Sequence, residues 1–142
     1  MHHEIELVLK IGPDNEPTHM ALGLDLTKRS IQDHLKEKSL PWAEAKAFTG
    51  SAVLGDWIEY NPKAEYSLEV NGNEVQRGSL TEMSWTPKQL IAKLANWAPI
   101  REGDILFTGT PSGVGPLSKN DEVIASLYIE GEHILSHHAK CV

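Results

Sequence analysis

The sequence has a single cysteine, Cys141, and no long run of apolar residues. One cysteine excludes a disulfide within the chain and a cysteine-rich zinc site, and it favours a reducing, cytoplasmic setting. Without an apolar stretch of about 18 residues, no transmembrane helix is expected. The start, MHHEIELVLKIG, lacks a basic segment ahead of a long apolar core, so we do not expect a signal peptide.

Basic residues are also scarce, with 13 Lys and Arg against 20 Asp and Glu, which gives a net charge of −7. An acidic surface disfavours nucleic acids and anionic membranes, so neither is expected as a partner. Internal repeats and low-complexity tracts are absent, and no linker divides the chain. A length of 142 residues therefore predicts one domain, residues 1–142, with a hydrophobic core of its own.

Alternation at the start predicts a half-buried strand over residues 3–11. One face would carry Ile5, Leu7, Leu9 and Ile11, and the other Glu4, Glu6, Val8 and Lys10. The apolar run over 20–26 predicts a buried strand that ends at Asp25.

Later segments predict two helices and several strands. Residues 27–38 and 87–97 have helical periodicity; Thr86 can cap the second helix, and Leu90, Ile91, Leu94 and Trp97 would form its apolar stripe. Asn71-Gly72-Asn73 predicts a hairpin between 66–70 and 74–77. Further strands are expected at 104–108, 122–129 and 133–138. This order of elements favours an α+β fold with a mixed sheet.

Three carboxylates form a candidate site for a hard cation. Glu4 and Glu6 are two residues apart on a predicted strand, so both leave the same face. Asp25 could supply a third oxygen ligand of the kind that Mg²⁺ binds. From the residues alone, a water-facing strand and a helix-capping Asp25 explain the same pattern.

Cationic and polar side chains follow this cluster along the chain. Arg29 and Gln32 lie four and seven residues after Asp25, on one side of the predicted helix. Arg29 could hold a substrate carboxylate, and Lys46, between two alanines, could stabilise an enolate. A solvated arginine and a lysine that reaches water are the alternatives. The Gly-rich loop 109–116 could bind a carboxylate through its amides and Thr110, or could merely connect two strands.

Four ordered segments together resemble the fumarylacetoacetate hydrolase family, in its small single-domain branch. They are HHEIEL at 2–7, LDLTKR at 24–29, PWAEAKAFTG at 41–50 and GDILFTGTPSGVGP at 103–116. The resemblance implies a rolled β-sheet, a homodimer, and Mg²⁺ or Mn²⁺ at the site. It also implies a metal held by Glu4, Glu6 and Asp25, substrate contacts from Arg29, Gln32, Gly109 and Thr110, and catalytic roles for Lys46 and Gln32.

The same resemblance implies a reaction on a small 2-oxo acid. We expect a divalent-metal-dependent C–C bond hydrolase that acts on β-diketo acids of the acylpyruvate or fumarylpyruvate type through an enolate. The sequence shows no match to the N-terminal segment of family members, in which a His and a Glu position or activate the attacking water. Oxaloacetate decarboxylation, 2-oxo acid isomerisation and an inactive metal-binding member are therefore the alternatives.

Overall fold

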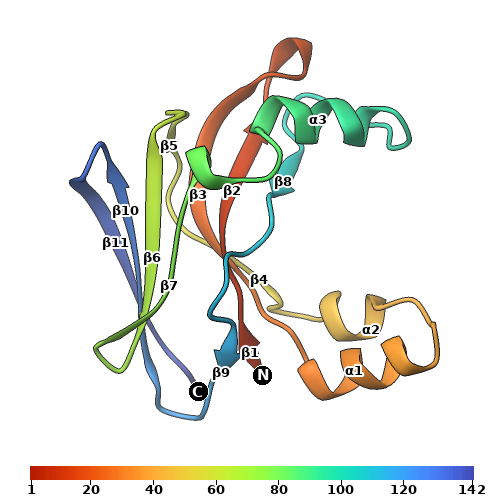
Figure 1. The fold of residues 1–142 in the computed structure, drawn as a ribbon, viewed down its shortest axis with the longest axis vertical. Helices are drawn as coiled ribbons and strands as arrows, with labels where there is room; N and C mark the ends of the chain where they lie inside the picture. Colours follow the sequence, from red (N-terminus) through yellow and green to blue (C-terminus); the bar gives the residue numbers. More distant parts are fainter.

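A computed structural model describes all 142 residues as two sheets that face each other, a short two-stranded pair, and helices on one side (Figure 1). The first large sheet contains β4 (Ala52–Leu54), β3 (Pro17–Asp25), β2 (Ile5–Ile11) and β8 (Ile105–Phe107), with β5 (Ile58–Glu59) also paired to β3. The second contains β11 (Glu132–Lys140), β10 (Glu122–Ile129), β6 (Ala64–Val70) and β7 (Asn73–Ser79). The short pair is β1 (His2–His3) with β9 (Gly115–Pro116).

The predicted α+β class is confirmed, but the sheets are antiparallel rather than mixed. Every pairing between named strands is antiparallel. Two of the neighbouring pairs, β6 with β7 and β10 with β11, are joined by tight hairpins. Asn71 and Gly72 have φ of 52° and 76°, the left-handed conformation that the predicted two-residue turn requires. Connections this short allow only antiparallel pairing.

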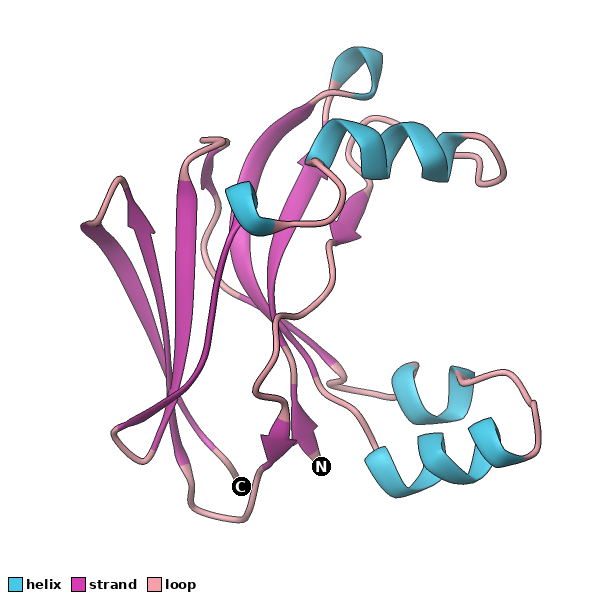
Figure 2. Cartoon of the chain, viewed as in Figure 1, coloured by secondary structure: helices cyan, strands magenta, loops and turns pink.

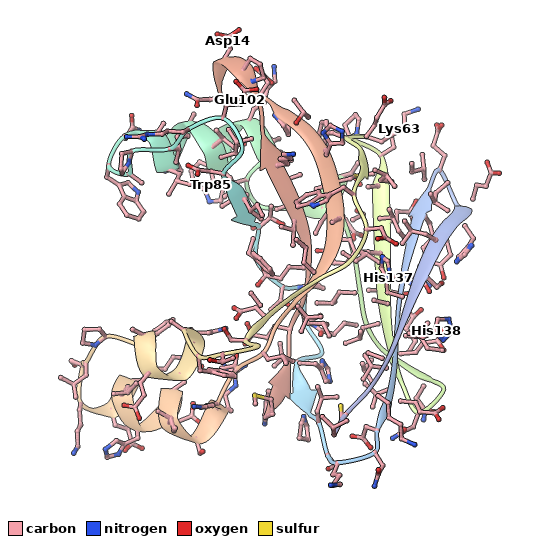
Figure 3. The ribbon with its side chains drawn as sticks, turned by 180° about the vertical axis from the view of Figure 1, so that it is seen from behind. Asp14, Lys63, Trp85, Glu102, His137 and His138 are labelled. Carbon is pink, nitrogen blue, oxygen red and sulfur yellow. The ribbon has the colours of Figure 1, made fainter.

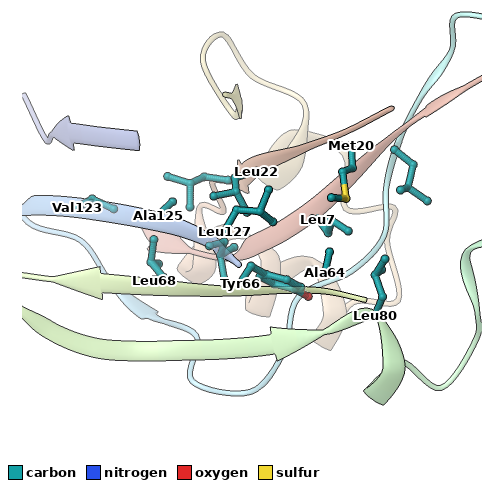
Figure 4. Close-up of a cluster of buried hydrophobic side chains, with 13 residues drawn as sticks. Leu7, Met20, Leu22, Ala64, Tyr66, Leu68, Leu80, Val123, Ala125 and Leu127 are labelled. Atoms are coloured by element: carbon teal, nitrogen blue, oxygen red, sulfur yellow. The ribbon is translucent and has the colours of Figure 1, made fainter. Parts of the chain in front are cut away.

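The hydrophobic core lies between the two large sheets (Figure 4). Leu7 and Leu22 project from β2 and β3 toward Tyr66 and Leu68 of β6 and Leu127 of β10. Leu7, Leu68 and Leu127 are completely buried. The apolar face predicted for the first strand is therefore confirmed as a core face.

The predicted strand forms at Ile5–Ile11, but its opposite face is also buried, so the prediction that this face is exposed is wrong. Val8 is completely buried on that face, and only Lys10 of β2 is exposed. The room for Val8 comes from Gly23 on the neighbouring strand. A Cβ at Gly23 would lie 2.6 Å from Val8 Cγ2 and 2.8 Å from Phe107 Cε1. A glycine there lets the two side chains pack over the sheet, which a pattern within one strand does not reveal.

The helices lie on the side of the first sheet that faces away from the second (Figures 1 and 2). They are α1 (Arg29–Glu37), α2 (Ala43–Lys46) and α3 (Pro87–Ala95). Two 3₁₀ turns, η1 (Pro13–Asn15) and η2 (Leu80–Glu82), follow β2 and β7, and Leu80 of η2 belongs to the core between the sheets. Thr86 caps α3 as predicted and forms a capping box with Gln89. Trp97 does not join the buried stripe: α3 ends at Ala95, and Trp97 is 80% exposed. None of the helices has the length and apolar composition needed to cross a membrane.

Candidate metal centre

Glu4, Glu6 and Asp25 meet beside one end of the first sheet. Pairing of β2 with β3 sets Ile5 opposite Leu24, and the Asp25 amide donates to the Glu4 carbonyl at 2.9 Å. One carboxylate oxygen from each of the three residues lies within 4.8 Å of the other two. Glu4 and Glu6 are buried, and Asp25 is half-buried. The structure thus brings together the three carboxylates that the sequence singled out.

Two cations from the following helices contact this cluster. The Lys46 ammonium, at the end of α2, donates to Glu4 Oε2 at 2.7 Å, to Asp25 Oδ2 at 2.6 Å and to Thr27 Oγ1 at 2.7 Å. Arg29, at the start of α1, donates to Glu4 Oε1 and to Gln32 Oε1. Glu4 therefore carries a cation on each of its oxygens, and the predicted Arg29, Gln32 and Lys46 all belong to one site.

Ion pairing fixes the charge of Glu4 and Lys46. Burial alone raises the pKa of the Glu4 carboxyl, but the hydrogen bonds and charges of Lys46 and Arg29 outweigh burial and lower it. Burial alone lowers the pKa of the Lys46 ammonium, but the hydrogen bonds and charges of Asp25 and Glu4 raise it. Lys46 is therefore a fixed positive charge at neutral pH and not a base.

Glu6 differs because no cation pairs with it. Its Oε2 accepts a hydrogen bond from the Gly109 amide at 2.7 Å. Burial, helped by the negative charges of Asp25 and Glu4, raises the pKa of Glu6 to about 7, although the Gly109 amide opposes this shift. A buried carboxylate with one amide donor is an unbalanced negative charge.

Glu6 should make the metal-free chain less stable as the pH rises. The unfolded carboxyl ionises near 4.5, whereas the folded one keeps its proton up to about 7. Below pH 4.5 both states are protonated; between 4.5 and 7 only the unfolded chain loses the proton, so the free energy of unfolding falls and stays lower above 7. The gap between the two pKa values corresponds to about 3 kcal/mol.

Thermal unfolding in EDTA from pH 5 to pH 8 measures this effect. We expect Glu6→Gln to match the native chain at pH 5 and to unfold at a higher temperature at pH 8. A difference between the two proteins that does not change with pH would contradict the expectation.

The Gly-rich loop lies along the strand that bears the glutamates. Thr108 Oγ1 donates to the Leu7 carbonyl at 2.6 Å, and β9 at the far end of the loop pairs with β1. Beside the loop, Gly109 and Thr110 line a cavity of about 420 Å³ with Tyr66 and Trp85. The two predicted loop residues therefore face a cavity next to the carboxylate cluster.

Sequence reasoning missed Gln76 on β7 and the role of His3. The Gln76 amide nitrogen donates to Thr110 Oγ1 at 2.8 Å, and its oxygen accepts from His3 Nδ1 at 2.8 Å. His137 and His138 lie far from this site: both are on β11, on the opposite side of the molecule from α1 and α2 (Figure 3). Neither they nor Cys141 join the acidic cluster.

The donor set fits a divalent cation. With all groups ionised, three carboxylates face two cations and leave one excess negative charge. A divalent ion would reverse that sign and leave the site attractive to an anion. Oxygen donors alone suit Mg²⁺ or Mn²⁺ and not a soft metal. The hydrogen bonds to Glu6 and Asp25 fall on Oε2 and Oδ2, so Glu6 Oε1 and Asp25 Oδ1 have lone pairs free for a metal.

Two antiparallel sheets with a cluster of three carboxylates beside a Gly-rich loop define a class of fold with a candidate metal centre, and one family model matches this chain. The model describes the C-terminal domain of fumarylacetoacetate hydrolase and matches residues 1–138. The chain belongs to the fumarylacetoacetate hydrolase family.

Two relatives show the breadth of this family. The mitochondrial oxaloacetate tautomerase of Homo sapiens is 36% identical over 143 residues, which cover 90% of this chain and 65% of the relative. The fumarylpyruvate hydrolase of Ralstonia sp. is 31% identical over 137 residues, 87% of this chain and 71% of the relative. The chain spans about two thirds of the length of these relatives.

A solved structure from the family has the same fold. Fumarylpyruvate hydrolase from Pseudomonas aeruginosa, crystallised with Mn²⁺ and pyruvate, superposes with a TM-score of 0.89 at 29% identity. The match covers 99% of this chain and 65% of the neighbour. The predicted family and rolled-sheet fold are therefore confirmed.

Proposed function

We propose that this chain is a divalent-metal-dependent enzyme that promotes enolisation of a small 2-oxo acid, with keto–enol tautomerisation of oxaloacetate as its reaction. The observation that carries the proposal is the convergence of Glu4, Glu6 and Asp25 with Lys46 and Arg29 at one site. The sequence relatives named oxaloacetate tautomerase support the choice of substrate.

Some residues of the site bind the substrate, and others stabilise the enolate that forms from it. Glu4, Glu6 and Asp25 would hold a divalent cation, which would supply Lewis acidity toward the 2-oxo acid. Arg29 uses one guanidinium nitrogen for Glu4 and another for Gln32, and its remaining N–H groups can donate to a substrate carboxylate. Lys46 places a fixed positive charge where the enolate oxygen develops.

Enolisation matches this site better than hydrolysis does. Tautomerisation of oxaloacetate removes one proton from the carbon between the ketone and the carboxylate and adds one to the keto oxygen. The carbon proton is already acidic, so solvent water can accept it and supply the other once the enolate is stabilised. Hydrolysis of a C–C bond needs in addition a base that delivers water to a carbonyl carbon. In the 142 residues of the structure, the acidic cluster contains no histidine and no fourth carboxylate.

Hydrolysis of a β-diketo acid, the reaction expected from the sequence, is the second candidate. The cavity beside Gly109 favours it, because Tyr66, Trp85 and Leu90 line a volume of about 420 Å³ that could take an acyl arm. The fumarylpyruvate hydrolase of Ralstonia sp. also supports it.

One set of assays separates these reactions. The ultraviolet absorbance of the oxaloacetate enol is followed with Mn²⁺ and with EDTA, and pyruvate is measured in the same samples. We expect Mn²⁺-dependent relaxation of the enol without pyruvate. Pyruvate from oxaloacetate would indicate decarboxylation, and loss of an acylpyruvate enol with release of pyruvate would indicate hydrolysis. Mn²⁺ binding without any turnover would overturn the proposal in favour of an inactive metal-binding protein.

A further inference from the structure

We propose that Gln76 is a positioning residue that fixes the direction of the Thr110 hydroxyl, so that Thr110 donates a hydrogen bond to an anionic oxygen of the bound acid. This inference rests on the proposed function. It concerns a strand, β7, that is not part of the predicted site; Gln76 bonds to His3, Ile5, Thr110 and Pro111, and not to the three carboxylates, Arg29 or Lys46.

The orientation of the Gln76 amide is fixed by backbone groups. Gln76 is only 2% exposed. Its Oε1 faces the Ile5 amide at 3.1 Å, which can only donate, and its Nε2 faces the Pro111 carbonyl at 3.0 Å, which can only accept. A flipped side chain would set donor against donor and acceptor against acceptor. The amide therefore has one orientation.

This orientation determines what Thr110 can do. One hydrogen on Nε2 goes to Pro111, and the other is donated to Thr110 Oγ1 at 2.8 Å. Thr110 Oγ1 thus accepts from Gln76, and its own hydrogen must point elsewhere. Thr110 lines the cavity of about 420 Å³, so its hydroxyl presents a donor there, suited to a carboxylate or an enolate oxygen.

The same strand fixes the path of the loop that carries Thr110. Gly113 has a φ of +100°, and a Cβ there would lie 2.0 Å from the Val75 carbonyl oxygen. Beyond it, Gly115 pairs with His3 in the short β1–β9 sheet. β7 touches the loop at Thr110, Pro111 and Gly113, so a change at Gln76 acts on the loop. Gln76 also accepts from the Ile5 amide on the strand that bears the glutamates, so the effect on the metal has to be measured separately.

The test is the affinity of the full chain for oxalate and pyruvate, measured by calorimetry with saturating Mn²⁺. Thr110→Val should weaken binding by about tenfold or more, the loss expected for one hydrogen bond to a charged group. Gln76→Leu should weaken it to a similar degree. The double variant should be no weaker than Thr110→Val alone, because Gln76 acts through the hydroxyl. Thr110→Ser keeps the hydroxyl and should bind as the native chain does.

Two controls separate positioning from loss of stability. Ser126→Ala removes a buried hydroxyl whose oxygen lies 2.7 Å from Ser136 Oγ, and it should leave both affinities unchanged. Mn²⁺ affinity should be the same in Thr110→Val, Thr110→Ser and Ser126→Ala. Gln76→Leu also removes the acceptor of the Ile5 amide, so its acid affinities are compared at Mn²⁺ concentrations that saturate that variant itself. Additive losses in the double variant, or native affinity in Gln76→Leu, would overturn the inference.

A further measurement keeps the inference testable if the proposed function fails. Hydrogen exchange of the Gly109 amide reports on the loop without any ligand. We expect it to be at least about tenfold faster in Gln76→Leu than in Ser126→Ala. If the native chain neither binds the two acids nor turns over any 2-oxo acid, the proposed function is wrong. Equal exchange rates of the Gly109 amide in Gln76→Leu and Ser126→Ala would overturn the positioning role of Gln76.

Discussion

Replacing Glu6 with glutamine is expected to reduce metal-dependent turnover to background while leaving the fold intact. Glu6 is the only one of the three carboxylates without a cationic partner, and the amide of the glutamine variant keeps an oxygen that can accept from the Gly109 amide. The substitution therefore removes one negative charge and one metal ligand and little else. We expect the affinity for Mn²⁺ to fall by more than about 100-fold, since changes outside the ligand set already cost up to that much.

Glu6→Gln should lose activity but gain stability. In EDTA at pH 8 it should unfold at a higher temperature than the native chain, because an unbalanced buried charge is gone. If the carboxylates of this site bind a cation, Glu6→Gln should be more stable than the native chain and yet inactive. Titration calorimetry with Mn²⁺ and the enol assay measure the loss, and Glu122→Gln, at an exposed position of β10, is the matched control. Native turnover in Glu6→Gln would contradict its assignment as a metal ligand.

The members of the carboxylate cluster could be predicted from the sequence because each signal is local. Alternation places Glu4 and Glu6 on one face of a strand, and an apolar run that ends at Asp25 marks the end of the next. Antiparallel pairing of these two strands then brings the carboxylates together. Arg29 and Gln32 follow from helical spacing, and they do contact each other in α1.

The burial of the cluster depends on contacts that no single segment encodes. The alternating pattern predicts that the face of β2 bearing Glu6 meets water. It is covered instead, because the Gly-rich loop returns from more than a hundred residues away and places the Gly109 amide on Glu6. A contact between residues so far apart in the sequence depends on the whole fold and cannot be predicted from the periodicity of one strand.

Gln76 could not be placed from the turn alone. The Asn71-Gly72 turn pairs Val70 with Asn73 and Glu69 with Glu74, but the register then shifts between Leu68 and Glu69, and this shift sets Gln76 opposite Leu68, a completely buried core residue. A polar side chain opposite a core leucine must find buried partners. The identity of those partners, His3 and Thr110, comes only from the packing of β7 against the loop.

Replacing Lys46 with methionine should separate metal binding from chemistry. The ammonium donates to Glu4, Asp25 and Thr27, and the first two are proposed metal ligands. Methionine has a similar length and no charge, so Glu4 and Asp25 lose a competing cation and Mn²⁺ affinity should stay the same or increase. Turnover should fall by about 10²–10³-fold in kcat, the usual effect of losing one stabilising group at a developing oxyanion.

Lys46→Arg is not expected to restore the rate, because a planar guanidinium cannot replace the compact ammonium between two carboxylates. Lys63→Met removes an exposed lysine paired with Glu130 and should change neither quantity. Glu6→Gln and Lys46→Met then have opposite signatures: the first loses the metal, and the second retains it and loses the reaction. Loss of Mn²⁺ affinity in Lys46→Met would mean that the lysine holds the carboxylates in place for the metal, and that the charge at the enolate comes from another group.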